Sequence, residues 1–146
     1  MKKTIFSTLM LLSFFAMLIT VGAQAQTDAA MTAQVPFEFS VNRQTLPADK
    51  YEVQVKLIGG NWALQINRHR RTEGIYFVTQ ATIRGAAPDA PQLIFHRYGE
   101  EYFLAEVRLS YERDALKLPR SHAEEEVMAA MQDAAPQIVA VNLTQP

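Results

Sequence analysis

The sequence predicts a mainly β domain: an antiparallel β-sandwich or a flattened small barrel of six to seven strands, with one short C-terminal helix. Apolar residues recur at every second position over several runs, which is typical of strands that bury one face. Turns that contain glycine separate these runs, and a single stretch near the C-terminus carries a helix cap. Strands with this spacing must stack or close to hide their apolar faces, which gives the predicted architecture.

The first two runs show the alternation most clearly. Every odd-numbered residue from 35 to 41 and from 51 to 57 is apolar, whereas the residues between them are polar apart from Pro36. The segment between the two runs reads LPADKY. Pro47 presets the backbone angle φ of a turn and Asp49 tolerates a positive φ, so we expect a connection here.

Gly59 and Gly60 predict a two-residue hairpin turn, because glycine adopts a positive φ without steric cost. Centring the turn there places apolar residues opposite apolar residues on one face, whereas a shift by one residue would destroy the match. The predicted pairs are Leu57 with Trp62, Val55 with Leu64, Val53 with Ile66, Gln54 with Gln65 and Glu52 with Asn67.

A further β-rich run covers residues 75–82, and the loop RGAAPDAP leads from it to a second hairpin at residues 92–107. The turn contains Gly99 together with either Glu100 or Tyr98. Both faces of this hairpin are partly apolar, which predicts a central strand pair that is covered on both sides. One face carries Leu93, Phe95, Arg97, Tyr102, Leu104 and Glu106, and the other carries Ile94, His96, Tyr98, Phe103, Ala105 and Val107.

The segment SHAEEEVMAAMQDAA predicts a helix over about residues 121–134. Ser121 and Glu124 have the spacing of a capping box, and acidic residues fill the first turn, where the helix dipole favours negative charge. Pro136 ends the segment. Residues 137–143 are compatible with either a last strand or an ordered tail.

The N-terminus predicts export. Two lysines precede an apolar stretch that ends in VGAQAQ, and Ala23 and Ala25 fit the small-residue rule of signal peptidase. We therefore expect a signal peptide at residues 1–25, with cleavage before Gln26; cleavage after Ala23 fits less well. The apolar stretch is shorter than the roughly 20 residues that a membrane span needs, and no cysteine follows for lipid attachment.

The expected mature chain consists of a flexible segment, residues 26–34, and a single β-rich domain, residues 35–146. Removing the two N-terminal lysines from the 14 basic residues leaves 12 against 15 acidic residues, a formal charge of −3. This balance argues against nucleic acid as a partner, because phosphate binding needs clustered positive charge. There is no cysteine, so packing alone must stabilise the exported domain, and no later segment predicts a membrane span.

Three segments resemble a family of small exported bacterial proteins with LPAGxY-like and FHRYGxxYFL-like segments; here they read VPFEFSVNRQTLPADKYEV, LIFHRYGEEYFLAEV and LPRSHAEEE. The resemblance covers most of the mature chain, about residues 35–127. It implies an exported, mainly β protein and carries over no activity, cofactor or catalytic residue. The chain departs from the family pattern at Asp49, where glycine is usual, and we expect Asp49 to adopt the left-handed conformation at modest cost.

Two charged segments are weaker candidates for a site. Arg68, Arg70 and Arg71 could bind an anion, such as a phosphorylated headgroup or a polyanionic glycan, but a solvated turn is the simpler interpretation. His122 and the glutamates after it have a helical spacing that suits a metal ion. Ligands from elsewhere are not marked, however, and capping explains the same glutamates, so no metal site is predicted.

His96 is the most interesting candidate. It lies on a partly apolar strand face near Tyr98 and Glu101, which are surroundings that suit a general base. Covalent catalysis would also need a nucleophile, and the chain has no cysteine and no serine in a recognisable nucleophile motif. A buried structural histidine explains the same pattern, so neither catalytic residues nor a cofactor are predicted.

The sequence therefore favours an exported, non-enzymatic binding or structural module of the cell envelope, in the periplasm or outside the cell. Its partner stays open between another envelope protein, a glycan and a small apolar ligand. One alternative is a small hydrolase-like enzyme that uses His96 with Glu101. The other is an apolar-ligand carrier with a cavity lined by Phe37, Phe39 and Trp62.

Overall fold

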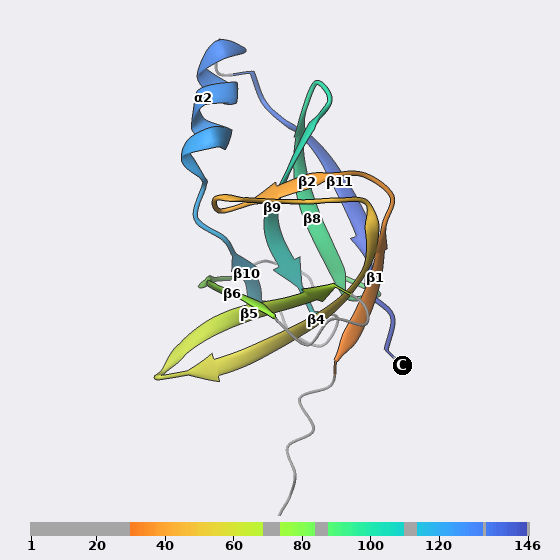
Figure 1. Cartoon of the computed structure of the whole chain (residues 1–146). Coiled ribbons are helices and arrows are strands. Elements are labelled where there is room, and N and C mark those ends of the chain that lie inside the picture. Colours follow the sequence, from red (N-terminus) through yellow and green to blue (C-terminus); the bar gives the residue numbers. More distant parts are fainter. Residues whose placement is uncertain (1–29, 69–73, 84–87, 110–113, 133, 146) are drawn as a thin grey trace, which may run out of the picture.

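The computed structural model describes residues 30–68, 74–83, 88–109, 114–132 and 134–145. These residues form two β-sheets that pack together, with one short helix at one end (Figure 1). The prediction of a mainly β sandwich with a C-terminal helix is confirmed. The expected signal peptide lies outside the described residues. Within the described part of the chain, no helix is long and apolar enough to cross a membrane.

The first sheet has the strand order β1-β4-β5-β6, and all of its pairs are antiparallel. Its strands are β1 (Met31–Val35), β4 (Asp49–Ile58), β5 (Asn61–Arg68) and β6 (Ile75–Val78). Strand β1 includes residues 31–34 of the segment, 26–34, that was expected to be flexible. The alternation of buried and more exposed residues already begins at Met31, so the domain starts earlier than the boundary at residue 35.

The second sheet has the order β11-β8-β9-β10-β7. Its strands are β7 (Gln80–Ile83), β8 (Gln92–Tyr98), β9 (Glu101–Arg108), β10 (Asp114–Lys117) and β11 (Gln137–Asn142). The C-terminal segment whose structure the sequence left open is therefore a strand, and it pairs antiparallel with β8.

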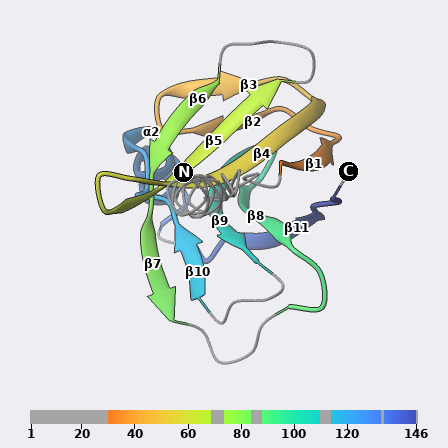
Figure 2. The ribbon, with the colours of Figure 1, turned by 90° about the horizontal axis from the view of Figure 1, so that it is seen from below.

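A short hairpin completes this sheet. It consists of β2 (Phe39–Val41) and β3 (Gln44–Leu46), and β2 lies parallel to β9. Along one side, Thr32 and Thr144 exchange backbone hydrogen bonds of 2.8 Å, which join the two sheets. On the other side the chain runs from β6 directly into β7, and Figure 2 shows this passage.

The core lies between the sheets and is rich in aromatic residues. Phe39 packs edge-on against Tyr51 of the first sheet, with ring centroids 5.4 Å apart, and against Phe95 of the second, at 5.1 Å. All three side chains are at most 2% exposed. Such aromatic pairs contribute roughly 0.5–1.5 kcal/mol each beyond the burial of their area, so Phe39 helps to hold the sheets together.

The predicted register of the hairpin formed by β4 and β5 is confirmed in every pair from Glu52 with Asn67 to Leu57 with Trp62. The outer end of this hairpin extends beyond the sandwich (Figure 1). Leu57 is therefore 62% exposed and Trp62 38% exposed, although both lie on the face that is buried further along the strands.

The hairpin formed by β8 and β9 follows the expected pairing only in part. Gly99 has a φ of 61°, Tyr98 lies opposite Glu101, and the turn residues are Gly99 and Glu100. The pairing then shifts between Ile94 and Phe95, so that Ile94 lies opposite Glu106. This β-bulge inserts one extra residue and moves Glu106 and Val107 to the faces opposite to those expected.

Helix α2 (His122–Ala130) is shorter than the predicted range of 121–134. Ser121 caps it as predicted, because its side chain accepts the backbone N–H of Glu124. The C-terminal end comes early because Gln132 adopts a φ of 57°, a left-handed conformation that ends helices.

The exposure difference along β4 and β5 leads to a stability prediction. Leu64→Ala should lower the free energy of unfolding by roughly 2–5 kcal/mol, because Leu64 is fully buried and the substitution leaves a cavity. Leu57→Ala removes the same atoms from an exposed site and should cost less than about 1 kcal/mol. Urea unfolding of both variants measures the difference. Equal losses would show that the end of the hairpin is covered in solution.

Candidate functional site

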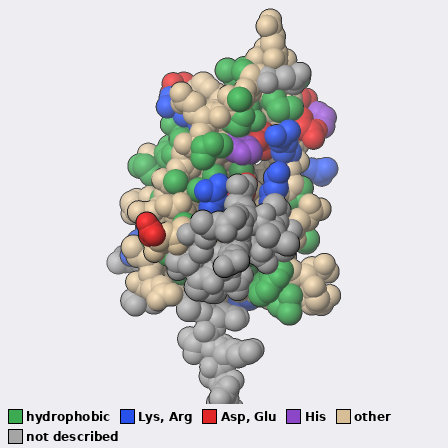
Figure 3. Space-filling view, turned by 180° about the vertical axis from the view of Figure 1, so that it is seen from behind, with side chains coloured by type: hydrophobic (Ala, Val, Ile, Leu, Met, Phe, Trp, Pro, Cys, Tyr) green, Lys and Arg blue, Asp and Glu red, His purple; other side chains and the backbone are tan. Residues whose placement is uncertain are grey.

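The candidate site lies where helix α2 meets strand β8. His96 projects from β8, and its Nδ1 atom is 2.6 Å from Oε1 of Glu124 on the helix. The side chains are 13% and 3% exposed, respectively. In the space-filling view of the back of the molecule, histidine, acidic and basic side chains gather near the helical end, with hydrophobic side chains around them (Figure 3).

Glu124 is held in place by its position in the helix. It lies in the first turn, where unpaired N–H groups and the helix dipole stabilise a carboxylate. The hydroxyl of Ser121 accepts its backbone N–H at 3.2 Å. Among the helix residues Glu124 is the one that is buried, so the helix contacts the sheet through a charged group.

Tyr98 completes the cluster two residues along β8. Its hydroxyl group donates a long hydrogen bond of 3.5 Å to Oε1 of Glu124, and its ring lies edge-on to His96. Burial raises the pKa of the Tyr98 phenol, the negative charge of Glu124 raises it further, and the positive charge of Arg120 acts in the opposite direction. The phenol therefore stays protonated beside the carboxylate.

A carboxylate bonded to an imidazole is also found in hydrolases, where it holds the histidine in the tautomer that activates a hydroxyl nucleophile. Within the described residues, Glu124 is the one side chain hydrogen-bonded to the His96 ring. The nearby hydroxyl of Ser121 is used to cap the helix. The observed arrangement therefore ties the helix to the sheet and supplies no nucleophile from the described part of the chain.

The structure brings together only some of the residues that the sequence singled out. His96 and Tyr98 share the cluster, but Glu101 does not belong to it. Glu101 is exposed at the start of β9 and lines a surface hollow of about 500 Å³ together with Glu38, Phe37 and neighbouring residues. The carboxylate that reaches His96 comes from a helix 28 residues further along the chain.

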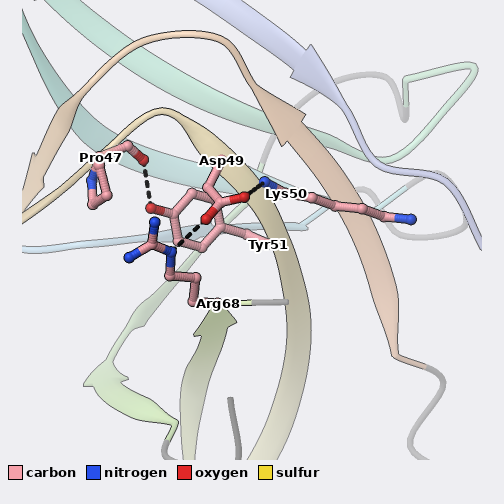
Figure 4. Close-up of polar contacts among 5 residues, drawn as sticks. All are labelled: Pro47, Asp49, Lys50, Tyr51 and Arg68. Carbon is pink, nitrogen blue, oxygen red and sulfur yellow. Dashed lines mark hydrogen bonds and ion pairs between the residues drawn. The ribbon is translucent and has the colours of Figure 1, made fainter. Parts of the chain in front are cut away.

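Arg68 lies away from this cluster, at the end of β5. Its guanidinium group is paired with the carboxylate of Asp49 (Figure 4). The other two candidate arginines, Arg70 and Arg71, lie outside the described residues. In the described part of the chain, Arg68 therefore serves as a partner for a carboxylate of the neighbouring strand.

The expectation that Asp49 adopts a left-handed conformation is wrong. The non-glycine residues with positive φ in the described chain are Asn42 and Gln132. Asp49 instead begins strand β4, where its carboxylate accepts the backbone N–H of Lys50 at 2.8 Å and pairs with Arg68. These two interactions favour the extended conformation over the turn.

Tyr51, two residues after Asp49 in the same strand, donates its hydroxyl to the carbonyl oxygen of Pro47 at 2.5 Å (Figure 4). Burial raises the pKa of this phenol, the positive charge of Arg68 lowers it, and the negative charge of Asp49 raises it. The bond closes the LPADKY segment onto the buried end of Tyr51. The Tyr51 hydroxyl at the edge of the core thus has a hydrogen-bond partner, as buried polar groups require.

The third histidine, His122, is paired with Glu126 one helical turn later, at 3.2 Å, and both side chains are largely exposed. Within the described residues, no group of three or more histidine, aspartate or glutamate side chains is arranged to hold a metal ion.

Sequence reasoning missed Glu124 as the partner of His96, because the capping box assigned it a local role. Only half of that box forms: Ser121 binds the N–H of Glu124, while the carboxylate of Glu124 turns to the sheet. One signal was available. Glu124 shares a helical face with Val127 and Met128, so a charged residue occupies the side on which apolar residues gather.

Comparisons of the chain with protein-family models, with characterised proteins and with solved structures find no match.

The cluster predicts unequal roles for neighbouring glutamates. Glu124→Gln should lower the free energy of unfolding by about 1–3 kcal/mol, because it weakens a buried charge-assisted hydrogen bond to His96. Glu125→Gln removes one negative charge from the same first turn but at an exposed position, so it should cost less than about 1 kcal/mol. Chemical unfolding of both variants gives the comparison. Equal effects would mean that the helix dipole alone accounts for Glu124.

The raised pKa of Tyr98 predicts a pH dependence. Because the folded-state pKa lies above the ordinary value of 10.0, the contribution of Tyr98 to stability is complete below that value and is lost as the pH rises through the folded-state pKa. When the pH is raised from neutral to about 11, the free energy of unfolding should therefore fall less in Tyr98→Phe than in the unmodified protein. Tyr51 titrates in the same direction and remains in both proteins. Parallel pH profiles would contradict the assignment.

Proposed function

We propose that the protein is exported and acts as a non-enzymatic binding or structural module of the cell envelope, in the periplasm or outside the cell. The lysine-flanked apolar N-terminus with Ala23 and Ala25 supports export and cleavage before Gln26. The described domain has no cysteine and is stabilised by the packing of its two sheets, which is compatible with either compartment.

The observation that carries the non-enzymatic part is the bond between His96 and Glu124. The histidine with the surroundings of a general base is mostly buried, and its Nδ1 atom is bonded to a carboxylate that is itself almost fully buried. A buried polar group needs a partner to avoid a large desolvation cost. Each residue of the pair supplies that partner for the other, so the pair has a structural reason to exist without substrate.

The two alternatives find less support. A hydrolase that uses His96 with Glu101 would need these side chains to meet, but Glu101 is exposed at the hairpin turn and the His96 ring is bonded to Glu124. A carrier cavity lined by Phe37, Phe39 and Trp62 would need these residues to share one space. Phe37 stacks on Tyr102 with ring centroids 3.9 Å apart, whereas Trp62 lies near the outer end of the hairpin in the other sheet.

Cell fractionation and intact-mass measurement test the proposal. The protein should appear in the periplasm or the culture supernatant with a mass that begins at Gln26, because Ala25 and Ala23 mark the cleavage site. Ala25→Arg should block processing and retain the chain at the membrane, whereas Ala30→Arg, beyond the cleavage site, should leave processing unchanged.

Recovery of the unprocessed chain in the membrane fraction or the cytoplasm would contradict export. An ester-hydrolysing activity of the purified protein that disappears in both His96→Gln and Glu101→Gln would contradict the non-enzymatic assignment and favour the hydrolase alternative.

A further inference from the structure

The outer end of the hairpin formed by β4 and β5 projects from the body of the sandwich, as both ribbon views show (Figure 1 and Figure 2). Residues 57–62 form this end, which we call the hairpin tip, and read LIGGNW, without a charged residue. Leu57, Ile58 and Trp62 are 62%, 50% and 38% exposed. These apolar side chains therefore lack the stabilisation that full burial would give them.

The exposed side chains lie on both faces of the hairpin. Leu57 and Trp62 form a cross-strand pair and therefore point to the same face. Ile58 follows Leu57 in β4, and successive residues of a strand point to opposite faces. A flat partner surface would cover one of these faces and leave the other in water. A medium that surrounds the tip covers both faces at once, and a lipid bilayer is such a medium.

The charges around the tip fit an anionic lipid surface. With increasing distance from the turn, the first charged residue of β4 is Lys56 and that of β5 is Arg68, and both are basic. The nearest acidic residue in these two strands is Glu52, six residues before Ile58, which is about 20 Å along a strand. The acidic first turn of helix α2 lies at the other end of the molecule (Figure 1). The tip can thus approach anionic headgroups without bringing a carboxylate of these elements close to them.

Lys56 also indicates how deeply the tip can insert. It points to the same face as Ile58 and lies two residues, or about 7 Å, further from the turn. Segments that lie in the membrane interface bury their apolar side chains by about 5–10 Å. With Ile58 at this depth, Lys56 is level with the lipid phosphates. Trp62 suits the same boundary, because its ring is apolar and its indole N–H can donate to headgroups.

The backbone of the tip is compatible with shallow insertion. The ladder between β4 and β5 continues to the pair of Ile58 with Asn61, so the strands are paired up to the turn. Gly59 and Gly60 form the turn, with φ angles of 58° and 82°, and without side chains they keep the end of the tip narrow. Unpaired backbone groups of a turn are strongly disfavoured in hydrocarbon. In the interface they can bond to water and headgroups, which limits the tip to that layer.

We propose that the hairpin tip docks the protein on an anionic phospholipid bilayer. Leu57, Ile58 and Trp62 insert into the interface of the bilayer, and Lys56 lies at the level of the phosphates. This inference deepens the proposed function, on which it rests, because it names a lipid surface as the partner of the envelope module.

Trp62 is the single tryptophan of the chain, so its fluorescence reports directly on the tip. The emission of the purified protein should shift to shorter wavelength when vesicles of phosphatidylcholine and phosphatidylglycerol in equal parts are added, because the indole leaves water. Vesicles of phosphatidylcholine alone should bind more weakly, since they do not attract Lys56. A quencher attached near the lipid headgroup should quench Trp62 more than one at the end of the acyl chain.

Leu57→Ser and Ile58→Ser test the two faces of the tip. Each should lower the affinity for the anionic vesicles roughly tenfold, because each removes an aliphatic side chain from the inserted surface. Ile138→Ser is the matched control, since Ile138 is 58% exposed on β11 of the other sheet. It should bind as the unmodified protein does. All three variants retain Trp62, and circular dichroism checks that they are folded.

An unchanged emission in the presence of anionic vesicles would overturn the proposal. Equal binding to both kinds of vesicle, stronger quenching from the acyl end, a loss confined to one tip variant or an equal loss in Ile138→Ser would also overturn it. A shift that grows with protein concentration without vesicles would instead assign the tip to association between chains. Because the vesicle test uses purified protein, its failure is distinct from a failure of export, which cell fractionation measures.

Discussion

The helical end of the molecule depends on one buried carboxylate. Taking an ionised glutamate out of water costs several kcal/mol unless partners replace the lost hydration. Glu124 has three sources of compensation: the helix N-terminus, the imidazole of His96 and the hydroxyl of Tyr98. Because two of them come from β8, the carboxylate is stabilised only when the helix lies against that strand. Any other position of the helix would leave the buried Glu124 carboxylate without these partners, so its burial fixes where the helix lies.

This requirement also explains the unusual composition of β8. A strand covered on one side would alternate apolar and polar residues, but Ile94 and Tyr98 are buried on the face opposite to Leu93 and Phe95. The histidine lies between Ile94 and Tyr98 on that face. The histidine is tolerated on this buried face because Glu124 of the helix forms a hydrogen bond with it. A structural requirement thus produces a segment that looks like a catalytic motif.

The sequence predicted local features well and distant ones poorly. The register between β4 and β5 was predictable because the glycine turn and the one-sided apolar pattern allow a single alignment. The shift in β9 was not, since both faces of that hairpin are apolar and a slip by one residue leaves no apolar residue obviously misplaced. The pairing of His96 with Glu124 spans 28 residues, and no periodicity reports such a distance. The backbone conformation of Asp49 was wrongly predicted for the same reason: its partner Arg68 is distant in the sequence and lies on another strand.

The two ends of the sandwich depart from the usual distribution of residues in opposite senses. At the helical end a charge is buried, and its partners lie within the same chain. At the other end apolar side chains of β4, β5 and β6 are exposed, among them Leu57, Trp62 and Val78. A buried charge whose partners lie in the same chain needs no partner from outside the molecule, whereas exposed apolar side chains are stabilised when they are covered. Contact with another molecule would therefore stabilise these exposed side chains more than it would the histidine cluster, although the histidine is the residue that draws attention in the sequence.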